Sequence, residues 1–247
     1  MGEVLVITSG KGGTGKTTLC AGIASCLAAM GQKVLAIDCD IGLNNLDIAL
    51  GMTDCATVSF LDVMMENQYL SDAPEHPVIP GLQLLTAPTK TRAGLVDDII
   101  FGRLIEEAAE SYDWVLLDAP AGIGYGFGLA AAYANRAILV ATADAGSLRD
   151  AQQTAALLTE KGIKQIELVV NRVTRRLLNS VRSNIDDIMD HVGLPLLGLI
   201  PEDPSVPVAA ANGSALVLRS RKGAAMACLR ISRRLLGMDA PLMHIRY

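Results

Sequence analysis

The chain has 247 residues, of which 51% are apolar and 19% are charged, and its 26 acidic and 21 basic side chains give a net charge of −5. This composition supplies a large core and excludes both a disordered chain and a small disulfide-stapled fold. It also argues against attraction of the whole surface to nucleic acid, although it allows a local basic patch.

Short apolar runs alternate with longer amphipathic segments along the chain. The short runs predict buried strands at residues 4–8, 34–37, 82–85, 114–117, 137–141, 166–170 and 196–200. The longer segments predict helices at residues 16–30, 59–66, 95–112, 147–161, 184–192 and 222–236. Nearly all-apolar strands separated by helices indicate an α/β fold with a mostly parallel, doubly wound sheet that helices cover on both faces.

No linker, internal repeat or low-complexity tract interrupts this pattern, so we predict a single domain over residues 1–247. Its last part is expected to hold a basic helix near residues 222–236 and a short tail at 237–247. The sequence shows no signal peptide and no apolar stretch continuous enough to span a bilayer, and its five cysteines lack C-x-x-C spacing. These features predict a cytoplasmic protein.

A glycine-rich loop follows the first predicted strand and opens the first helix. It matches the G-x-x-x-x-G-K-[ST] pattern, in which backbone N–H groups and a helix N-terminus surround phosphate oxygens. Lys16 is expected to reach the β- and γ-phosphates of a nucleotide, and the Thr17 hydroxyl to ligate Mg²⁺. The candidate phosphate-binding residues are Gly10, Lys11, Gly12, Gly13, Thr14, Gly15, Lys16, Thr17 and Thr18.

Carboxylates follow two further strands at the edge of the sheet where parallel sheets bind ligands. Asp40 can hold a water in line with the γ-phosphorus or on Mg²⁺, and Asp38 and Asp40 can also cap the next turn. Asp118 ends a buried strand, so its charge needs a partner, which Mg²⁺ can supply directly or through water.

Other polar and glycine positions allow two interpretations each. Asn171 can pair with an adenine edge, although asparagine is also common at strand ends. Lys11 can neutralise phosphate charge in its own subunit or in a partner, or can be a solvated side chain. The four glycines at alternate positions 122–128 suit a mobile loop that senses the γ-phosphate, and the last two also suit close packing of a helix on the sheet.

Several motifs resemble those of the MinD/ParA family of deviant Walker A ATPases. The segment from Lys11 to Thr18 is similar to the family's phosphate loop, and segments 38–47 and 118–124 resemble its next motif and its Walker B strand with the second switch. Segments 171–172 and 200–203 are similar to its adenine-side segments, and segment 147–150 to a helix start that binds partner proteins. The D-x-G-L-x-N-L-D string favours the MinD branch over the plasmid-partition branch.

The resemblance implies a P-loop NTPase fold and a homodimer that sandwiches two ATP molecules and hydrolyses ATP to ADP and phosphate with Mg²⁺. It implies a role in cell-division site placement, through a division inhibitor or an activating protein of the MinC or MinE kind. Lys11 would reach the partner's phosphates and act in catalysis with Lys16 and Asp40. The other implied roles are ATP binding by Asn171, Arg172 and Pro201, switching by Asp38, Asn45 and Gly122, and partner binding by Arg149 and Asp150.

Residues 204–238 include no acidic side chain and several basic ones. The helix expected there either packs its apolar side on the sheet or lies on an anionic membrane. Relatives carry a further amphipathic segment that binds membrane, and segment 241–246 is too short and too weakly amphipathic for that anchor. A peripheral position on the inner face of the cell membrane therefore stays open. The basic residues are Arg219, Arg221, Lys222, Arg230, Arg233 and Arg234.

Other functions remain as alternatives. A ParA-type chromosome or plasmid partition ATPase would bind DNA non-specifically through these same basic residues. A metabolic enzyme or iron–sulfur carrier on the same scaffold is disfavoured, because paired cysteines and a further substrate motif are missing. A non-hydrolysing binding module is disfavoured because Lys16, Asp40 and Asp118 are all present.

Overall fold

The computed structural model describes residues 1–89, 96–174 and 184–242. These residues form one sheet of seven parallel strands in the order β3-β2-β4-β1-β5-β6-β7. This result confirms the predicted parallel α/β fold and each predicted strand. The strands are β1 (Glu3–Thr8), β2 (Val34–Asp38), β3 (Leu82–Leu85), β4 (Trp114–Asp118), β5 (Arg136–Thr142), β6 (Gln165–Val173) and β7 (Leu196–Pro201).

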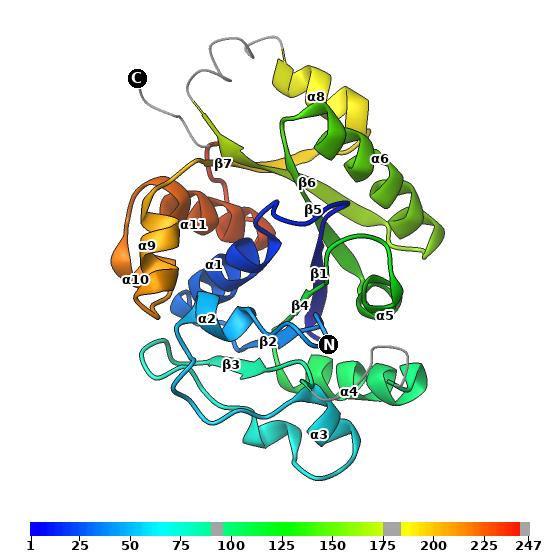
Figure 1. Ribbon diagram of the computed structural model, residues 1–247, viewed down its shortest axis with the longest axis vertical. Coiled ribbons are helices and arrows are strands. Elements are labelled where there is room, and N and C mark those ends of the chain that lie inside the picture. The colour runs from blue at the N-terminus through cyan, green and yellow to red at the C-terminus, as the bar shows by residue number, and fades with distance from the viewer. Residues whose placement is uncertain (90–95, 175–183, 243–247) are drawn as a thin grey trace.

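Helices cover both faces of the sheet (Figure 1). On one face lie α1 (Lys16–Ala29) and α11 (Gly223–Leu235). On the other face lie α4 (Asp98–Ser111), α5 (Tyr125–Ala132) and α6 (Ala145–Glu160). The other helices in the described residues are α2 (Leu46–Leu50), α3 (Phe60–Met64), α8 (Asn184–Val192), α9 (Ser205–Ala211) and α10 (Leu216–Arg219), with a 3-10 turn at Leu70–Asp72.

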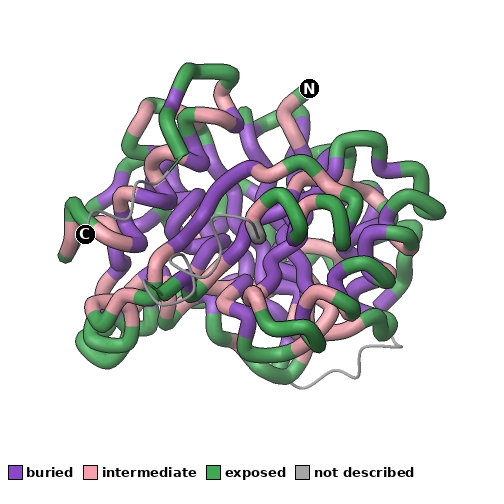
Figure 2. Tube along the Cα trace, turned by 90° about the horizontal axis from the view of Figure 1, so that it is seen from above, coloured by how far each residue is buried: buried purple, intermediate pink, exposed green. Residues whose placement is uncertain are grey.

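The central strands are buried along almost their whole length, which explains their apolar sequences. Every residue of β2 and β4 is buried, as expected for strands covered on both faces. Figure 2 shows buried stretches of the chain in the interior and exposed segments around them. Parallel pairing places Ile7 and Asp38 level with Asp118 on either side of β4. The sheet therefore brings polar ends of separate strands to one edge.

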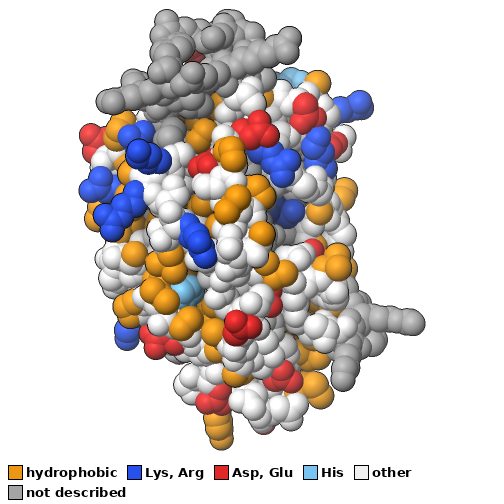
Figure 3. Space-filling model, turned by 60° about the vertical axis from the view of Figure 1, so that its left-hand side comes forward, with side chains coloured by type: hydrophobic (Ala, Val, Ile, Leu, Met, Phe, Trp, Pro, Cys, Tyr) orange, Lys and Arg blue, Asp and Glu red, His pale blue; other side chains and the backbone are white. Residues whose placement is uncertain are grey.

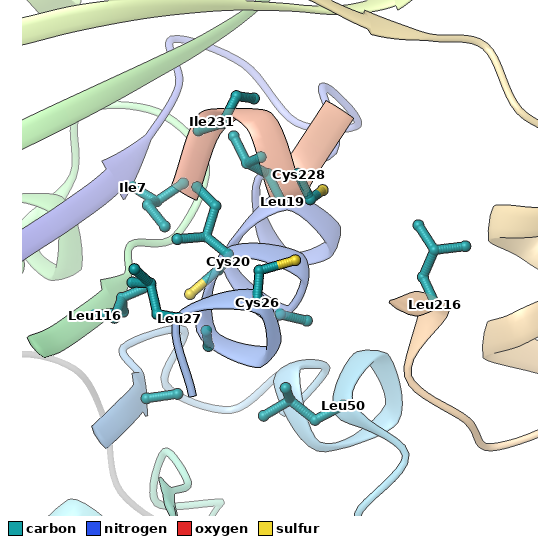
Figure 4. Close-up of a cluster of buried hydrophobic side chains, with 14 of the residues drawn as sticks. Ile7, Leu19, Cys20, Cys26, Leu27, Leu50, Leu116, Leu216, Cys228 and Ile231 are labelled. Carbon is teal, nitrogen blue, oxygen red and sulfur yellow. The ribbon is translucent and has the colours of Figure 1, made fainter. Parts of the chain in front are cut away.

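Small and sulfur-containing side chains let α1 and α11 approach closely (Figure 4). A Cβ at Gly22 of α1 would lie 2.5 Å from the Sγ of Cys228 of α11. Ile231 and Leu235 continue the buried side of α11, whereas Arg233 is exposed. The predicted basic helix is thus present and packs its apolar side on the domain. Within the described ranges, the structure contains no helix that is both long and apolar enough to cross a membrane.

The structure corrects the sequence prediction at several helices. The short helices α2, α9 and α10 were not predicted, because so few residues show little of a helical period. The long helix expected from residue 95 begins at Asp98, while residue 95 itself lies outside the described residues. The mobile stretch expected up to residue 128 is wrong in its second half, because Gly126 and Gly128 belong to α5.

Close packing explains why glycine is needed in that helix. A Cβ at position 126 would lie 2.6 Å from Cγ of Pro120 and 3.3 Å from the carbonyl oxygen of Cys39. Gly126 therefore allows α5 to pack closely on the residues that follow β4 and β2, in line with the packing alternative, whereas Gly128 shows no such close contact. The end of β6 also differs from the predicted end at residue 170, because the strand continues past Asn171 to Val173.

Candidate functional site

The glycine loop links β1 to α1 and rests on α6. A Cβ at Gly10 would lie 2.5 Å from the Cβ of Asp150, so glycine is required for this contact. Gly13 and Gly15 have φ angles of +78° and +93°, which glycine adopts without strain. The loop thereby leads directly into the N-terminus of α1. The first N–H groups of a helix lack partners within it and can bind phosphate.

A buried lysine and two carboxylates lie at this end of the sheet. Lys16 is 8% exposed, and burial lowers its pKa, while the nearby charges of Asp118 and Asp40 favour its ammonium form. Asp118 is 2% exposed, and burial, together with repulsion from Asp38, raises its pKa to about 7. The Thr17 hydroxyl hydrogen-bonds to Asp118 and opposes this shift. The predicted phosphate and metal residues are therefore brought together.

Asp38 and Asp40 have different environments although they are close in sequence. The Asp38 carboxylate accepts hydrogen bonds from the backbone N–H groups of Asp40, Asn45 and Leu46, at 2.9, 3.1 and 3.1 Å. Burial nevertheless raises its pKa to about 6. Asp38 thus caps the turn and the start of α2, as one of the sequence interpretations allowed. Asp40 is only half-buried and feels the charge of Lys16, so its side chain is available to a ligand or water.

The donor set suits Mg²⁺ better than a metal held by protein alone. In the residues that the structure describes, no group of three or more His, Cys, Asp or Glu side chains could hold a metal ion. Mg²⁺ instead takes one or two protein oxygens and completes its shell with waters and phosphate oxygens. The buried Oδ1 of Asp118 has no hydrogen-bond partner in the described structure, and neither has Oγ1 of Thr8 or Thr14. Such unsatisfied oxygens fit a hydrated cation and a phosphate.

A groove of 1510 Å³ runs from the phosphate loop along the ends of β6 and β7 to α11. Ligand pockets commonly measure about 300–1,000 Å³, so the groove has room for a whole nucleotide. It joins candidate ATP-binding residues that lie far apart in the sequence. Those in its lining are Gly15, Thr18, Asn171, Arg172 and Pro201.

Lys11 is paired with a carboxylate of its own chain. Its Nζ lies 2.8 Å from Oδ1 of Asp144, which begins α6 as the N-cap. Asp144 also accepts hydrogen bonds from the Thr142 hydroxyl and the Ser147 N–H, and with Lys11 these hold its pKa well below the usual range. The sequence analysis missed Asp144, although an Asp directly before a helix is a capping signal.

The candidate switch and partner residues lie around the loop. Gly122 has a φ of +82°, and its N–H donates to the carbonyl of Ser9 over 3.3 Å. Asn45 is exposed directly before α2. On α6, Arg149 is exposed and Asp150 contacts Gly10. The positions are consistent with the expected roles, which stay predictions.

Comparison with known proteins agrees with this site. Residues 5–217 match the model of the CobQ/CobB/MinD/ParA nucleotide binding domain. The septum site-determining protein MinD of Synechocystis is 35% identical over 247 residues, covering 98% of this chain and 92% of that protein.

Two solved structures share the fold over nearly the full chain. The MinC:MinD cell division protein complex of Aquifex aeolicus matches with a TM-score of 0.89 at 35% identity, covering 98% of both chains. MinD of Pyrococcus horikoshii complexed with Mg-ADP matches with a TM-score of 0.83 at 28% identity, covering 95% of this chain and 96% of that one. The chain therefore belongs to the MinD/ParA family of P-loop nucleotide-binding proteins, in the branch of the septum site-determining MinD proteins.

Proposed function

We propose that this protein is a Mg²⁺-dependent ATPase that dimerises with ATP, hydrolyses it to ADP and phosphate, and acts in the placement of the division site. The observation that carries this proposal is the cluster of the buried Lys16 and Asp118 with the half-buried Asp40 beneath a glycine loop. Such a cluster is costly in an apolar interior unless a phosphate and a cation complete it.

The residues divide the work of hydrolysis among them. Lys16 and the loop N–H groups hold the β- and γ-phosphates and draw off negative charge as the terminal phosphoryl group leaves. Asp40, half-buried and within the field of Lys16, holds the attacking water in line. Asp118 and the Thr17 hydroxyl would hold Mg²⁺, which supplies further neutralisation of phosphate charge when bound.

The same end of the molecule supports dimerisation. Leu43 and Ile123 are 65% and 59% exposed, and they lie in the loops that carry Asp40 and Gly122. Large apolar side chains so exposed beside a ligand site favour burial against a second copy. In the proposed dimer, Lys11 leaves Asp144 and reaches the partner's phosphates, so that hydrolysis depends on dimerisation.

Partner proteins are proposed to bind at the start of α6. Arg149 is exposed there, while Asp150 contacts the phosphate loop at Gly10, so this helix can report the state of the loop. The Aquifex relative is found in a complex with MinC. We infer a division inhibitor or an ATPase activator of the MinC or MinE kind as the partner here.

A basic face suggests where the protein resides. Figure 3 shows one face of the molecule, on the upper part of which Lys and Arg side chains gather beside apolar ones. In the described part of the chain, Arg219, Arg221 and Lys222 form no ion pair and are exposed, as is the apolar Leu218. Basic and apolar side chains together favour an anionic membrane, so we propose a cytoplasmic protein that binds the inner face of the cell membrane peripherally.

The decisive experiment uses the Asp40→Ala protein, which should keep ATP bound. Light scattering is expected to show dimers with ATP and monomers with ADP, and a monomer in both states would contradict the proposed switch. Sedimentation with anionic liposomes is expected to pellet the ATP form only. Failure to pellet, together with DNA binding that weakens steeply with salt, would favour the partition ATPase instead.

A further inference from the structure

Two hydrogen bonds orient the side-chain amide of Asn171. Its Nδ2 donates to the carbonyl oxygen of Thr14 over 2.7 Å, and its Oδ1 accepts from the backbone N–H of Arg172 over 2.8 Å. Because a carbonyl only accepts and a backbone N–H only donates, these contacts determine which way the amide faces. The first bond joins residues 157 positions apart and ties the end of β6 to the phosphate loop.

The backbone at this point departs from regular strand geometry. The register between β6 and β7 shifts between Val170 and Val173, and Arg172 has a φ of +56°. A residue other than glycine stays in the left-handed region only when its surroundings hold it there. Irregularities of this kind beside a ligand groove commonly redirect a side chain, and here they occur at Asn171.

The phosphate loop is shaped to receive the amide. A Cβ at Gly15 would lie 2.3 Å from Nδ2 of Asn171, so any larger residue would displace the side chain. Thr14 is 1% exposed, so water has little access to it, although Asn171 itself is only half-buried. Loss of the amide would therefore leave a poorly solvated carbonyl without its partner and would loosen the loop.

We propose that Asn171 is a positioning residue that holds the phosphate loop in its binding shape and connects it to the base end of the groove. Asn171 lines this groove beside Arg172 and Pro201. Thr14 uses one N–H of the amide, so the second N–H can meet an acceptor on a bound base. One side chain then senses base and phosphates together, which deepens the proposed ATP-binding function and rests on it.

Hydrogen–deuterium exchange of the nucleotide-free protein tests the positioning role without any ligand. Asn171→Ala should speed exchange in the peptide that covers the phosphate loop about threefold to tenfold, the effect of one lost hydrogen bond. The matched control is Asn135→Ala, because the Asn135 Oδ1 also accepts a backbone bond, from the N–H of Val4, at the opposite end of the sheet. Unchanged loop exchange in Asn171→Ala, or equal acceleration in the control, would overturn the proposal.

A ligand without a base separates loop positioning from base recognition. Inhibition of ATP binding by Mg-tripolyphosphate should weaken about threefold to tenfold in Asn171→Ala, and ATP affinity at least as much, with neither changed in Asn135→Ala. Weaker ATP binding with unaltered tripolyphosphate binding would reduce Asn171 to a base contact. If the wild-type protein bound no ATP, the proposed function would fail, whereas the exchange experiment would still decide the role of Asn171 in the loop.

Discussion

The phosphate-loop end of the sheet and the corner around His76 both bury polar side chains, but the phosphate-loop end leaves some of their atoms without a partner among the described residues. His76 is 4% exposed, its Nε2 lies 2.9 Å from the Leu50 carbonyl, and its Nδ1 accepts from the N–H groups of Val78 and Ile79. At the loop, by contrast, the buried Oδ1 of Asp118 lacks a partner among the described residues.

The difference teaches how to separate structural from functional polar groups. Folding selects sequences that pair their buried donors and acceptors, so an unpaired group needs another explanation. At the His76 corner, the chain completes its own hydrogen bonds and joins the end of α2 to residues 76–79. At the phosphate loop, a ligand must complete the hydrogen bonds. Without the nucleotide, the unpaired polar groups lower the stability of the fold.

The largest effect is expected from Lys16→Ala, which removes the phosphate-contacting cation. ATP affinity should fall at least about a hundredfold, because a buried charge-assisted contact is lost without replacement. ATP-dependent dimerisation, followed by light scattering, should disappear, while the thermal unfolding profile stays cooperative. Dimerisation with ATP at wild-type level would refute this assignment of the loop.

Asp40→Ala should slow turnover about a hundredfold or more and leave ATP affinity within a few-fold of wild type, because only the water-positioning group is lost. Phosphate release measures turnover, and equilibrium titration measures affinity. Asp54→Ala, at an exposed aspartate in the same half of the chain, serves as the control and should hydrolyse normally. A wild-type rate in Asp40→Ala would exclude the proposed role.

His76→Ala tests the corner around His76, where the chain pairs its own buried polar groups. The free energy of unfolding should fall by about 2–4 kcal/mol, because two N–H groups and a carbonyl lose partners and a cavity forms. Urea unfolding measures this loss, and ATP affinity of the folded protein should not change. A large change in affinity with little loss of stability would reverse the comparison between the two regions.

The same histidine predicts a pH dependence. Burial lowers the pKa of His76, so the unfolded chain binds a proton more readily than the folded one below pH 6.5, its ordinary value. This contribution to the free energy of unfolding is present above pH 6.5 and is lost as the pH falls. The difference in stability between wild type and His76→Ala should therefore shrink below pH 6.5.

Asp118→Asn should stabilise the nucleotide-free protein, whereas His76→Ala should destabilise it. Because the pKa of Asp118 is raised to about 7, its charged form destabilises the fold above that pH, and its contribution to stability returns as the pH falls toward 4. The variant should gain about 1–2 kcal/mol at pH 8, less at pH 5, and lose Mg-ATP affinity. Lower stability than wild type at pH 8 would mean that the charge is already compensated.

The smallest effect is expected from Asp144→Asn. Asparagine still caps α6, and an ion pair as exposed as that with Lys11 contributes little, so stability should stay within about 0.5 kcal/mol. Urea unfolding at low and at high salt measures it. A loss above about 1.5 kcal/mol would show that the pair is a structural lock.

Much of the fold could be predicted from local patterns, because buried parallel strands are read directly as short apolar runs. The boundaries of β1, β2 and β4 differ from the prediction by no more than two residues. The helix α5 was missed because glycine-rich segments carry the signature of a loop, and only the contact of Gly126 with Pro120 shows why glycine suits a helix there.

The candidate site was less predictable than the fold. The phosphate loop is contiguous, so its spacing alone indicated the role of Lys16. Two contacts join segments that are distant in the sequence, and no local pattern predicts them. They are the hydrogen bond from Asn171 to Thr14 and the ion pair of Lys11 with Asp144. Spacing alone left Asp38 and Asp40 alike, and only the family resemblance separated their roles; their burial and hydrogen bonds now distinguish a turn cap from an available carboxylate.

The sequence by itself determined the fold class, the phosphate loop and the family, because apolar periodicity and a contiguous glycine pattern depend on neighbouring residues. The tertiary structure alone decided which distant groups meet. It placed Asp118 beside Thr17 with its Oδ1 unpaired among the described residues, and it joined Asn171 to the loop. Strand order and register determine these long-range contacts. Both depend on the packing of the whole chain rather than on any single segment.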